Sequence, residues 1–406
     1  MSAANKTPLG VLIVDDSPFM RLTLQKILNQ NPDIKVLDTA RDGREGILKL
    51  QALRPQVVTM DVEMPVMDGL QALDEIMRWQ PTPVIILSAV TTEGAQATLK
   101  ALDLGAFDVV AKPSGSPGAD LQALSRDLVE KVKAAAGVNP ERLGRQGIKS
   151  SLGTGTPSGG SKGTIPGTPG NISGSTPASV PAGSSASPPT NTAAPQSQRL
   201  SGSGKSSFPK YPIQVVAIGT STGGPSALQA VLPALPVNFP VPVLVAQHMP
   251  PGFTAPLAQR LNGLCALNVR EGIHGEALKP GTVYVAPAGK QLQVVRKSGQ
   301  LTLAIGEEAP IPTLYHPSVD VMFLSLAKEV GKGTLGVVMT GMGSDGTKGM
   351  KELKAADGFA IAESEETCVV YGMPRSVVEA GLADRIVPLG DIGKAIVECV
   401  MRRGNL

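Results

Sequence analysis

Residues 213–225 read IQVVAIGTSTGGP, an apolar stretch that runs into a glycine-rich turn and then into a helical pattern from Ser226. Near-continuous runs of Val, Ile and Ala are typical of strands that are buried on both faces of a parallel sheet. Two further runs of this kind cover residues 241–246 and 334–340. We therefore expect the C-terminal part of the chain to form a doubly wound, mainly parallel α/β domain of Rossmann-like type.

The N-terminal part of the chain shows the same alternation of apolar runs and amphipathic segments. Segments such as 20–28 and 46–53 have the spacing of amphipathic helices. Between such segments lie five apolar runs, at residues 9–14, 34–39, 56–60, 83–87 and 108–111. This pattern predicts a five-stranded, doubly wound parallel sheet of flavodoxin-like type.

A stretch of low complexity separates the two blocks. Between residues 151 and 200, 34 of 50 residues are Ser, Thr, Gly or Pro, and Lys162 and Arg199 are the charged ones. Such a composition buries too little apolar surface to offset the ordering of its backbone. We expect an N-terminal domain over residues 1–136, a flexible linker over 137–210 and a C-terminal domain over 211–406.

Composition narrows the class of protein. Apolar residues make up 42% of the chain, which is enough for a buried core, and the net charge of +3 is too small for a dedicated nucleic-acid binder. Three widely spaced cysteines form neither a disulfide framework nor a zinc site. The N-terminus lacks the features of a secretory signal, and the longest apolar runs suit strands rather than membrane spans. We expect a cytoplasmic protein without membrane insertion.

Polar side chains follow four strands of the N-terminal sheet. Asp15 and Asp16 follow the first run, Asp61 the third, Ser88 the fourth and Lys112 the fifth. Because the carboxyl ends of parallel strands share one edge, these side chains should converge there. The negative charges of three adjacent carboxylates repel one another, and Mg²⁺ together with Lys112 would supply the positive charge that balances them. The alternative for any one of these aspartates is a solvated turn residue.

Ser221 lies in the pattern G-x-S-x-G, between a strand and a helix. The glycines allow a sharp turn that exposes the serine hydroxyl at the sheet edge. Two other interpretations stay open for the loop, because it could bind phosphate at the helix N-terminus or simply cap the helix.

A nucleophilic serine needs a base and an acid that orients it. His248 follows the run 241–246 and should therefore lie at the same edge as Ser221. Asp345 lies in a glycine-rich turn after the run 334–340 and is the best candidate for the acid. Asp320 and Asp357 are less well placed, because each lies within or next to a predicted helix.

The N-terminal block resembles a two-component receiver domain. The segments that carry the resemblance are VDDS (residues 14–17), MDVEMPVMDG (60–69), LSA (87–89) and KP (112–113). The resemblance implies that Asp61 is the phospho-acceptor, and that Ser88 and Lys112 contact the phosphoryl oxygens. It also implies that Asp15, Asp16, Asp61 and the Glu63 carbonyl hold Mg²⁺, and that the Lys112–Pro113 bond is cis.

The C-terminal block resembles the catalytic domain of chemotaxis protein-glutamate methylesterases of the CheB type. The matching segments are IGTSTGG (218–224), QHMPPGFT (247–254), PSVD (317–320), TGMGSDG (340–346) and CVVYGMP (368–374). The resemblance implies that Ser221 is the nucleophile, His248 the base and Asp345 the orienting acid. It further implies that Thr222 and the region of Met342 support the oxyanion, and that the catalytic domain needs no cofactor.

Two positions depart from the family pattern. Gln291 stands where the family commonly has His, and His316 stands where Arg often precedes the PSVD segment. We expect both to affect packing or substrate contact rather than the three candidate catalytic residues.

Taken together, the motifs predict a phosphorylation-activated serine hydrolase that demethylates glutamate γ-methyl esters on chemoreceptors and deamidates receptor glutamines. The implied partners are the cytoplasmic helices of methyl-accepting chemoreceptors, as substrate, and a chemotaxis histidine kinase, as phosphodonor. The alternative is a response regulator whose C-terminal domain is a non-catalytic binding module. A small-molecule esterase also stays open, whereas a transcription factor is disfavoured because no basic helix-turn-helix pattern is present.

Overall fold

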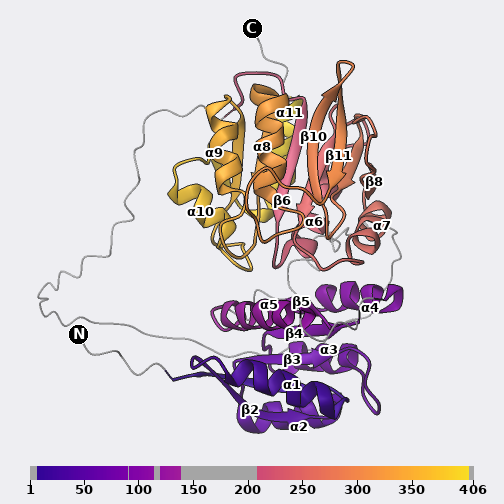
Figure 1. Ribbon diagram of the computed structural model, residues 1–406, viewed down its shortest axis with the longest axis vertical. Helices are drawn as coiled ribbons and strands as arrows, with labels where there is room; N and C mark the ends of the chain where they lie inside the picture. The colour runs from indigo at the N-terminus through magenta and orange to yellow at the C-terminus, as the bar shows by residue number, and fades with distance from the viewer. Residues whose placement is uncertain (1–6, 90, 114–118, 139–207, 402–406) are drawn as a thin grey trace, which may run out of the picture. The chain divides into compact units, whose positions relative to one another are not determined.

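The structure is a computed structural model, and it describes residues 7–89, 91–113, 119–138 and 208–401 (Figure 1). Most of the linker expected over residues 137–210 lies outside these ranges. The N-terminal and C-terminal domains are described separately below.

The N-terminal domain is a five-stranded sheet with the strand order β2-β1-β3-β4-β5, and all neighbouring strands are parallel. Its strands are β1 (Leu9–Val14), β2 (Ile34–Ala40), β3 (Val57–Asp61), β4 (Val84–Ser88) and β5 (Asp108–Ala111). Its helices are α1 (Pro18–Asn29), α2 (Gly43–Leu53), α3 (Gly69–Trp79), α4 (Thr92–Asp103) and α5 (Ala119–Ala135). The expected flavodoxin-like sheet is confirmed.

Alternate residues of each strand in this sheet pack against different helices. On one face, Val11 and Ile13 of β1 belong to a cluster that also contains Leu24 of α1 and Leu128 of α5. On the other face, Leu12 and Val14 cluster with residues of α2, α3 and α4. Because both faces are buried, the strands read as continuous apolar runs, which is why the sequence predicted them well.

The C-terminal domain contains a seven-stranded sheet with the order β14-β13-β12-β6-β7-β9-β8, and every pair in it is parallel. Its strands are β6 (Val215–Thr220), β7 (Val243–Gln247), β8 (Asn268–Glu271), β9 (Thr282–Val285), β12 (Thr334–Val338), β13 (Phe359–Glu363) and β14 (Arg385–Val387). Its helices are α6 (Gly224–Val231), α7 (Thr254–Leu264), α8 (Val319–Glu329), α9 (Thr347–Ala355), α10 (Met373–Glu379) and α11 (Leu389–Met401). Short 3₁₀ turns follow α6 and α8.

Two layers cover this sheet. Val216 and Ile218 of β6 pack with residues of α6, α7 and α11, whereas Val215 and Ala217 pack with residues of α8, α9 and α10. An antiparallel hairpin of β10 (Gln291–Lys297) and β11 (Gln300–Gly306) adds its apolar side to the second layer, beside α8. The doubly wound, mainly parallel fold is confirmed, and the hairpin is a feature that the sequence patterns did not predict.

The strand order fixes where a site can form in each domain. In the C-terminal sheet, β6 lies between β7 and β12, and the helices that follow β6 and β12 pack on opposite faces. In the N-terminal sheet, β1 and β3 have the same relationship, because α1 and α3 lie on opposite faces. Such switch points open a crevice at the carboxyl ends of the strands. Among the helices that fall inside the described ranges, none is both long and apolar enough to cross a membrane.

Candidate active site and phosphorylation site

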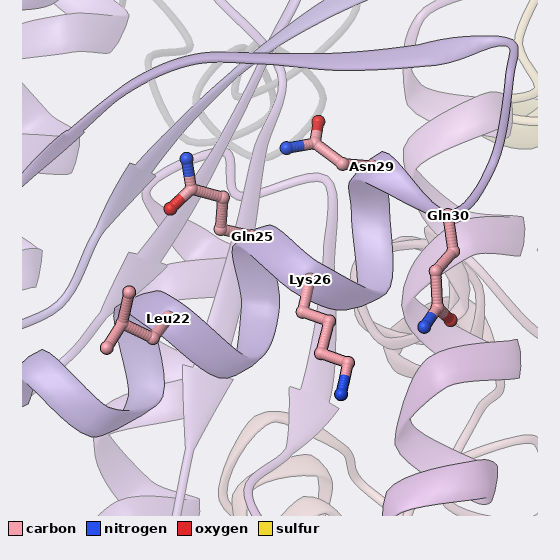
Figure 2. Close-up of a pocket in the computed structure, with 5 residues that line it drawn as sticks. All are labelled: Leu22, Gln25, Lys26, Asn29 and Gln30. Atoms are coloured by element: carbon pink, nitrogen blue, oxygen red, sulfur yellow. The ribbon is translucent and has the colours of Figure 1, made fainter.

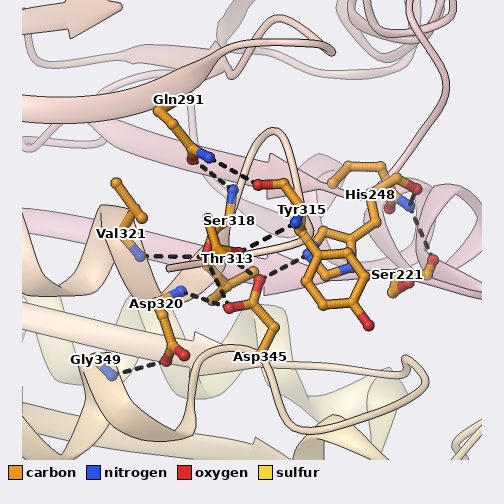
Figure 3. A network of polar contacts seen from close by, with 12 residues as sticks. Ser221, His248, Gln291, Thr313, Tyr315, Ser318, Asp320, Val321, Asp345 and Gly349 are labelled. Atoms are coloured by element: carbon orange, nitrogen blue, oxygen red, sulfur yellow. Dashed lines mark hydrogen bonds and ion pairs between the residues drawn. The ribbon is translucent and has the colours of Figure 1, made fainter. Parts of the chain in front are cut away.

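Ser221 and His248 follow neighbouring strands at the same register. Thr220, the last residue of β6, is paired with Gln247, the last residue of β7. The backbone N–H of His248 donates to the Thr220 carbonyl at 3.1 Å. Because parallel neighbours lie about 4.8 Å apart, Ser221 and His248 leave the sheet side by side at its carboxyl edge (Figure 3).

Glycine is required at the turn that carries Ser221. Gly223 has a φ of +77°, in the left-handed region that glycine adopts without strain. At Gly224, a Cβ atom would lie 2.0 Å from Oε1 of Gln247, so no side chain fits between the turn and β7. Gly341, in the loop after β12, is packed so closely that its Cβ would lie 2.8 Å from the Cβ of Ser221. The serine is therefore held between the ends of β6, β7 and β12.

The carboxylate of Asp345 accepts four hydrogen bonds. His248 Nε2 and the N–H of Val319 contact its Oδ2 at 2.8 and 2.7 Å, while the Ser318 hydroxyl and the N–H of Asp320 contact Oδ1 at 2.8 and 3.0 Å. Ser318 is also the N-cap of α8, so these donors come from the start of one helix. Burial opposes the charge of Asp345, but His248 and these backbone N–H groups outweigh it and lower the pKa of Asp345.

The start of α8 also carries a second buried carboxyl group, that of Asp320, whose pKa is shifted in the opposite direction. Burial, together with the charge of Asp345, raises the pKa of Asp320, although the N–H of Gly349 donates to it at 2.8 Å. Asp320 lies in the first turn of α8 and contacts Asp345 through its backbone. The geometry therefore separates the two aspartates, because the side chain of Asp345 is the one that reaches His248. Asp357 is exposed beyond the end of α9.

The contact with Asp345 defines the tautomer of neutral His248. Every group on Asp345 donates, so the aspartate is ionised and Nε2 of His248 carries the proton. Nδ1 is then the basic nitrogen of the ring, and it is buried without a hydrogen-bond partner in the described part of the chain. A buried, unpartnered basic nitrogen, on the residue that leaves the sheet beside Ser221, is available to receive the proton of a serine hydroxyl.

Tyr315 packs against the imidazole of His248, and Gln291 fixes the loop that carries Tyr315. The rings of Tyr315 and His248 are stacked, with centroids 4.1 Å apart and an interplanar angle of 3° (Figure 3). Gln291 is fully buried, donates to the Tyr315 carbonyl at 2.7 Å and accepts from the Ser318 N–H at 2.8 Å. Gln291 thus holds the loop that carries Tyr315 and Ser318, whereas His316 in the same loop is exposed.

Two backbone N–H groups near Ser221 are available for an anionic oxygen. Within the described ranges, no hydrogen-bond acceptor is found for the N–H of Thr222 or of Met342. Thr222 follows the serine directly, and Met342 lies next to Gly341, which packs against Ser221. The positions that the sequence assigned to the oxyanion are therefore close to the nucleophile in the fold.

In the N-terminal domain, three aspartates and a lysine converge at the carboxyl edge. Carboxylate oxygens of Asp15, Asp16 and Asp61 lie within 4.8 Å of one another. Lys112 Nζ lies 3.0 Å from Asp15 Oδ2 and 2.6 Å from Asp61 Oδ2. Burial would lower the pKa of Lys112, but its hydrogen bond to Asp61 and the negative charges raise it. Burial raises the pKa of Asp61, with an added effect from Asp15, against the opposing effect of Lys112.

This cluster fits a Mg²⁺ ion. The ion pair with Lys112 is close enough for a charge interaction but does not have hydrogen-bond geometry at Asp15, so the buried Oδ2 of Asp15 has no hydrogen-bond donor among the described residues. The carboxylate oxygens of Asp15, Asp16 and Asp61 together form the hard oxygen donor set that Mg²⁺ prefers.

The remaining residues predicted for this site have separate surroundings. Glu63 lies two residues beyond Asp61, and its N–H donates to Asp61 at 3.4 Å. The hydroxyl of Ser88 donates to the carbonyls of Gly94, at 3.1 Å, and Ala89, at 3.3 Å, so it is bound to the α4 end of the loop rather than to the aspartates. The expected cis bond before Pro113 was wrong, because the cis peptide bond of the described residues precedes Pro317.

A shallow depression on the N-terminal domain lies elsewhere (Figure 2). Its lining comes from α1 and the residue that caps it, namely Leu22, Gln25, Lys26, Asn29 and Gln30. Since these residues lie on one helix, no group from a second element converges with them, and the depression lacks the construction of a ligand site.

Sequence reasoning missed three supporting residues of the C-terminal site. Tyr315 carries no motif, because its stacking on His248 depends on the path of a loop. Thr340, whose carbonyl accepts from the Ser221 N–H at 3.0 Å, and Ser318 lie within segments that resemble the family. A serine before a helix start is a recognisable N-cap signal. What that signal does not reveal is that the Ser318 hydroxyl also donates to a carboxylate 27 residues away.

Comparisons with known proteins agree with the two domains. Residues 216–396 match the model of the CheB methylesterase family, and residues 11–122 match the response regulator receiver domain. A protein-glutamate methylesterase/protein-glutamine glutaminase of Desulfitobacterium hafniense strain Y51 is 69% identical over 98% of this chain and 99% of its own length. A Moorella thermoacetica relative with the same description is 45% identical over 98% of this chain and 99% of its own length.

A solved structure is also similar to the C-terminal domain. The Thermotoga maritima CheB methylesterase catalytic domain has 43% sequence identity and a TM-score of 0.45, and the match covers 46% of this chain and 99% of that one.

Proposed function

The chain belongs to the CheB methylesterase family, with a response regulator receiver domain at its N-terminus, and on that basis we propose that it is a phosphorylation-activated protein-glutamate methylesterase and protein-glutamine glutaminase. Ser221, His248 and Asp345 are its catalytic residues. The observation that carries this assignment is the buried Nδ1 of His248, which lacks a partner while Asp345 holds Nε2. A binding module has no need for a basic nitrogen kept in this state beside a serine.

In the first half of the reaction, Ser221 Oγ attacks the carbonyl carbon of a glutamate γ-methyl ester. His248 Nδ1 takes the hydroxyl proton as the C–O bond forms, and Asp345 stabilises the resulting imidazolium through Nε2. The N–H groups of Thr222 and Met342 stabilise the negative charge that develops on the carbonyl oxygen. When the tetrahedral intermediate collapses, His248 returns the proton to the leaving oxygen and methanol departs.

In the second half, water replaces methanol. His248 Nδ1 removes a proton from the water as its oxygen attacks the acyl carbon, and the proton then passes to Ser221 Oγ as the acyl–oxygen bond breaks. The products are a free glutamate and the regenerated enzyme. A glutamine side chain passes through the same tetrahedral intermediate, with ammonia as the leaving group, so one set of residues serves both activities.

Asp61 is the phospho-acceptor of the receiver domain. Asp15, Asp16, Asp61 and the Glu63 carbonyl would hold Mg²⁺, which neutralises charge on the phosphoryl group during its transfer. Lys112, already paired with Asp15 and Asp61, contacts the phosphoryl oxygens, and Ser88 must release Gly94 to do so. Formation of the acyl phosphate raises the hydrolase rate.

The partners and location follow from the same chemistry. The substrate is a glutamyl side chain on the cytoplasmic helices of methyl-accepting chemoreceptors, and the phosphodonor is a chemotaxis histidine kinase. Such partners require a cytoplasmic protein. The free thiols of Cys265, Cys368 and Cys399 are in keeping with a reducing compartment.

Methanol release from methylated chemoreceptor membranes tests this function. We expect release by the wild-type chain, stimulation by a small phosphodonor with Mg²⁺, and loss of release in Ser221→Ala. Asp61→Asn should retain basal release and lose the stimulation. Ser226→Ala in α6 and Asp74→Asn in α3 are matched controls, because both lie in the same domains and outside the two sites.

Each failure has a separate meaning. Wild-type protein that releases no methanol under any condition would leave the C-terminal domain as a binding module or as an esterase for another substrate. Release that persists in Ser221→Ala would remove Ser221 as nucleophile. Stimulation that persists in Asp61→Asn would leave the esterase intact and exclude the phosphorylation switch at Asp61.

A further inference from the structure

Glu363 is a buried acid that the mechanism above does not use. It is the last residue of β13, next to β12 in the sheet, and its side chain is 0% exposed. Among the described residues, no Lys, Arg or His forms an ion pair with this carboxylate. Buried carboxylates without a cationic partner are costly, and their neighbours explain why they persist.

The neighbours of Glu363 donate hydrogen bonds to it. The N–H of Thr340 contacts Oε2 at 2.8 Å, the hydroxyl of Thr367 contacts Oε1 at 3.0 Å, and the thiol of Cys368 adds a further hydrogen bond. An ionised carboxylate accepts and never donates, so this set of donors matches the charged form.

Thr340 connects this carboxylate to the turn of the nucleophile. Its carbonyl accepts from the Ser221 N–H at 3.0 Å and from the Thr220 hydroxyl at 3.0 Å. Its own hydroxyl donates to the Thr222 carbonyl at 2.9 Å and accepts from the Val370 N–H at 3.0 Å. Thr340 thus contacts the Thr220 side chain and the backbone of Ser221 and Thr222, and Glu363 holds Thr340 by its N–H.

We propose that Glu363 is a positioning residue for the hydrolysis, which as a carboxylate anchors Thr340 and thereby aims Ser221 and the adjacent Thr222 N–H at the substrate. This inference rests on the proposed function of Ser221. Glu363 does not touch substrate, and it acts through the backbone of Thr340.

Protonation of Glu363 weakens this anchor. The N–H of Thr340 then donates to the oxygen of a neutral acid instead of to a charged carboxylate, and hydrogen bonds to an ionised acceptor are roughly twice as strong as those to a neutral one. Burial raises the pKa of Glu363 to about 7, against the lowering effect of the Thr340, Thr367 and Cys368 contacts. Cys368 is the other titratable group in contact with this carboxyl, and no charged group from β12, β13 or β14 contributes to the shift.

The pH dependence of kcat for methanol release tests the proposal in the full-length chain. Wild-type kcat should fall in acid through two ionisations, that of the general base and that of Glu363. Glu363→Gln resembles the neutral acid, with one accepting oxygen and one donating group, and it does not titrate, so its kcat should lie between those of wild type and Glu363→Ala at high pH and its acid limb should lose one ionisation. Glu363→Ala lacks the anchor, and its kcat should fall by about tenfold or more at every pH, with KM unchanged.

Glu366→Gln is the matched control, because Glu366 is an exposed acid three residues further along the chain. It should follow the wild-type profile. An acid limb that is identical in wild type and Glu363→Gln would overturn the proposal, as would a Glu363→Ala variant with wild-type kcat. If Ser221→Ala retained activity, the proposed function itself would fail, whatever the result at Glu363. Circular dichroism at each pH establishes that the variants compared are folded.

Discussion

The contact between His248 and Asp345 gives a quantitative expectation for Asp345→Asn. The carboxylate has two oxygens for four donors, and Asn offers one oxygen and one donating amide. If the amide nitrogen takes the place of Oδ2, it faces two N–H donors, those of His248 and Val319. The histidine can relieve this by moving its proton to Nδ1, which removes the basic nitrogen beside Ser221.

The size of the effect follows from this change of tautomer. In serine hydrolases of unrelated fold, replacing the orienting Asp by Asn lowers kcat by about 10⁴-fold for this reason. Asp345 orients His248 in the same way, through Nε2. We therefore expect kcat to fall by about 10³–10⁴-fold, equivalent to about 4–5 kcal/mol of transition-state stabilisation. KM should change little, since Asp345 is buried and does not touch the substrate.

Initial rates of methanol release from methylated receptor membranes measure this loss, with Asp357→Asn as control. Asp357 is exposed and has a φ of +61°, a conformation that Asn adopts readily, so this variant should be fully active. The double variant Ser221→Ala/Asp345→Asn should be no slower than Ser221→Ala, because the residues act as a unit. A loss smaller than about tenfold in Asp345→Asn would refute the tautomer argument.

Three further perturbations have defined outcomes. Gly341→Ala places a Cβ 2.8 Å from the Cβ of Ser221 and 2.4 Å from Met373 Sδ, so kcat should fall at least about tenfold while circular dichroism stays unchanged. Lys112→Ala removes the cation beside Asp61, so phosphodonor stimulation of methanol release should be lost and basal release retained. Burial raises the pKa of Glu363 from 4.5 to about 7, so the folded state binds this proton more tightly than the unfolded state does. The free energy of unfolding should therefore decrease, by up to about 3 kcal/mol, as the pH rises from 4.5 to about 7. Calorimetric unfolding at about pH 5 and about pH 8 should show this loss in wild type and not in Glu363→Gln.

The parts of the fold that the sequence predicted are those with a local physical signature. Strands buried on both faces must be apolar throughout, so the runs 9–14 and 108–111 coincide with β1 and β5. The hairpin of β10 and β11 was not predicted. One side of it packs beside α8 and the other side is partly exposed, so its strands do not read as continuous apolar runs. Helix starts were also displaced, as at α1, which begins at Pro18 after the Ser17 cap rather than at residue 20.

The candidate site divides in the same way. Ser221 and His248 could be placed from the sequence because each directly follows a strand, and parallel strands align their ends. The roles of Tyr315 and Glu363 could not, because they arise from contacts between segments far apart in the chain. Tyr315 reaches His248 from 67 positions away only because a loop folds back over the sheet edge, and no local pattern encodes that path.

Three buried acids at one edge of the C-terminal sheet show why residue type alone does not assign a role. Asp345 faces four donors including His248, and its pKa is lowered, so it is a permanent anion that can orient an imidazole. Asp320 lies beside that anion and its pKa is raised, which suits a helix-start contact rather than a second orienting acid. Glu363 has donors but no cation, and its pKa of about 7 places its charge under the control of pH. The donors around each carboxyl, rather than its place in the sequence, decide which acid supports the base and which one responds to pH.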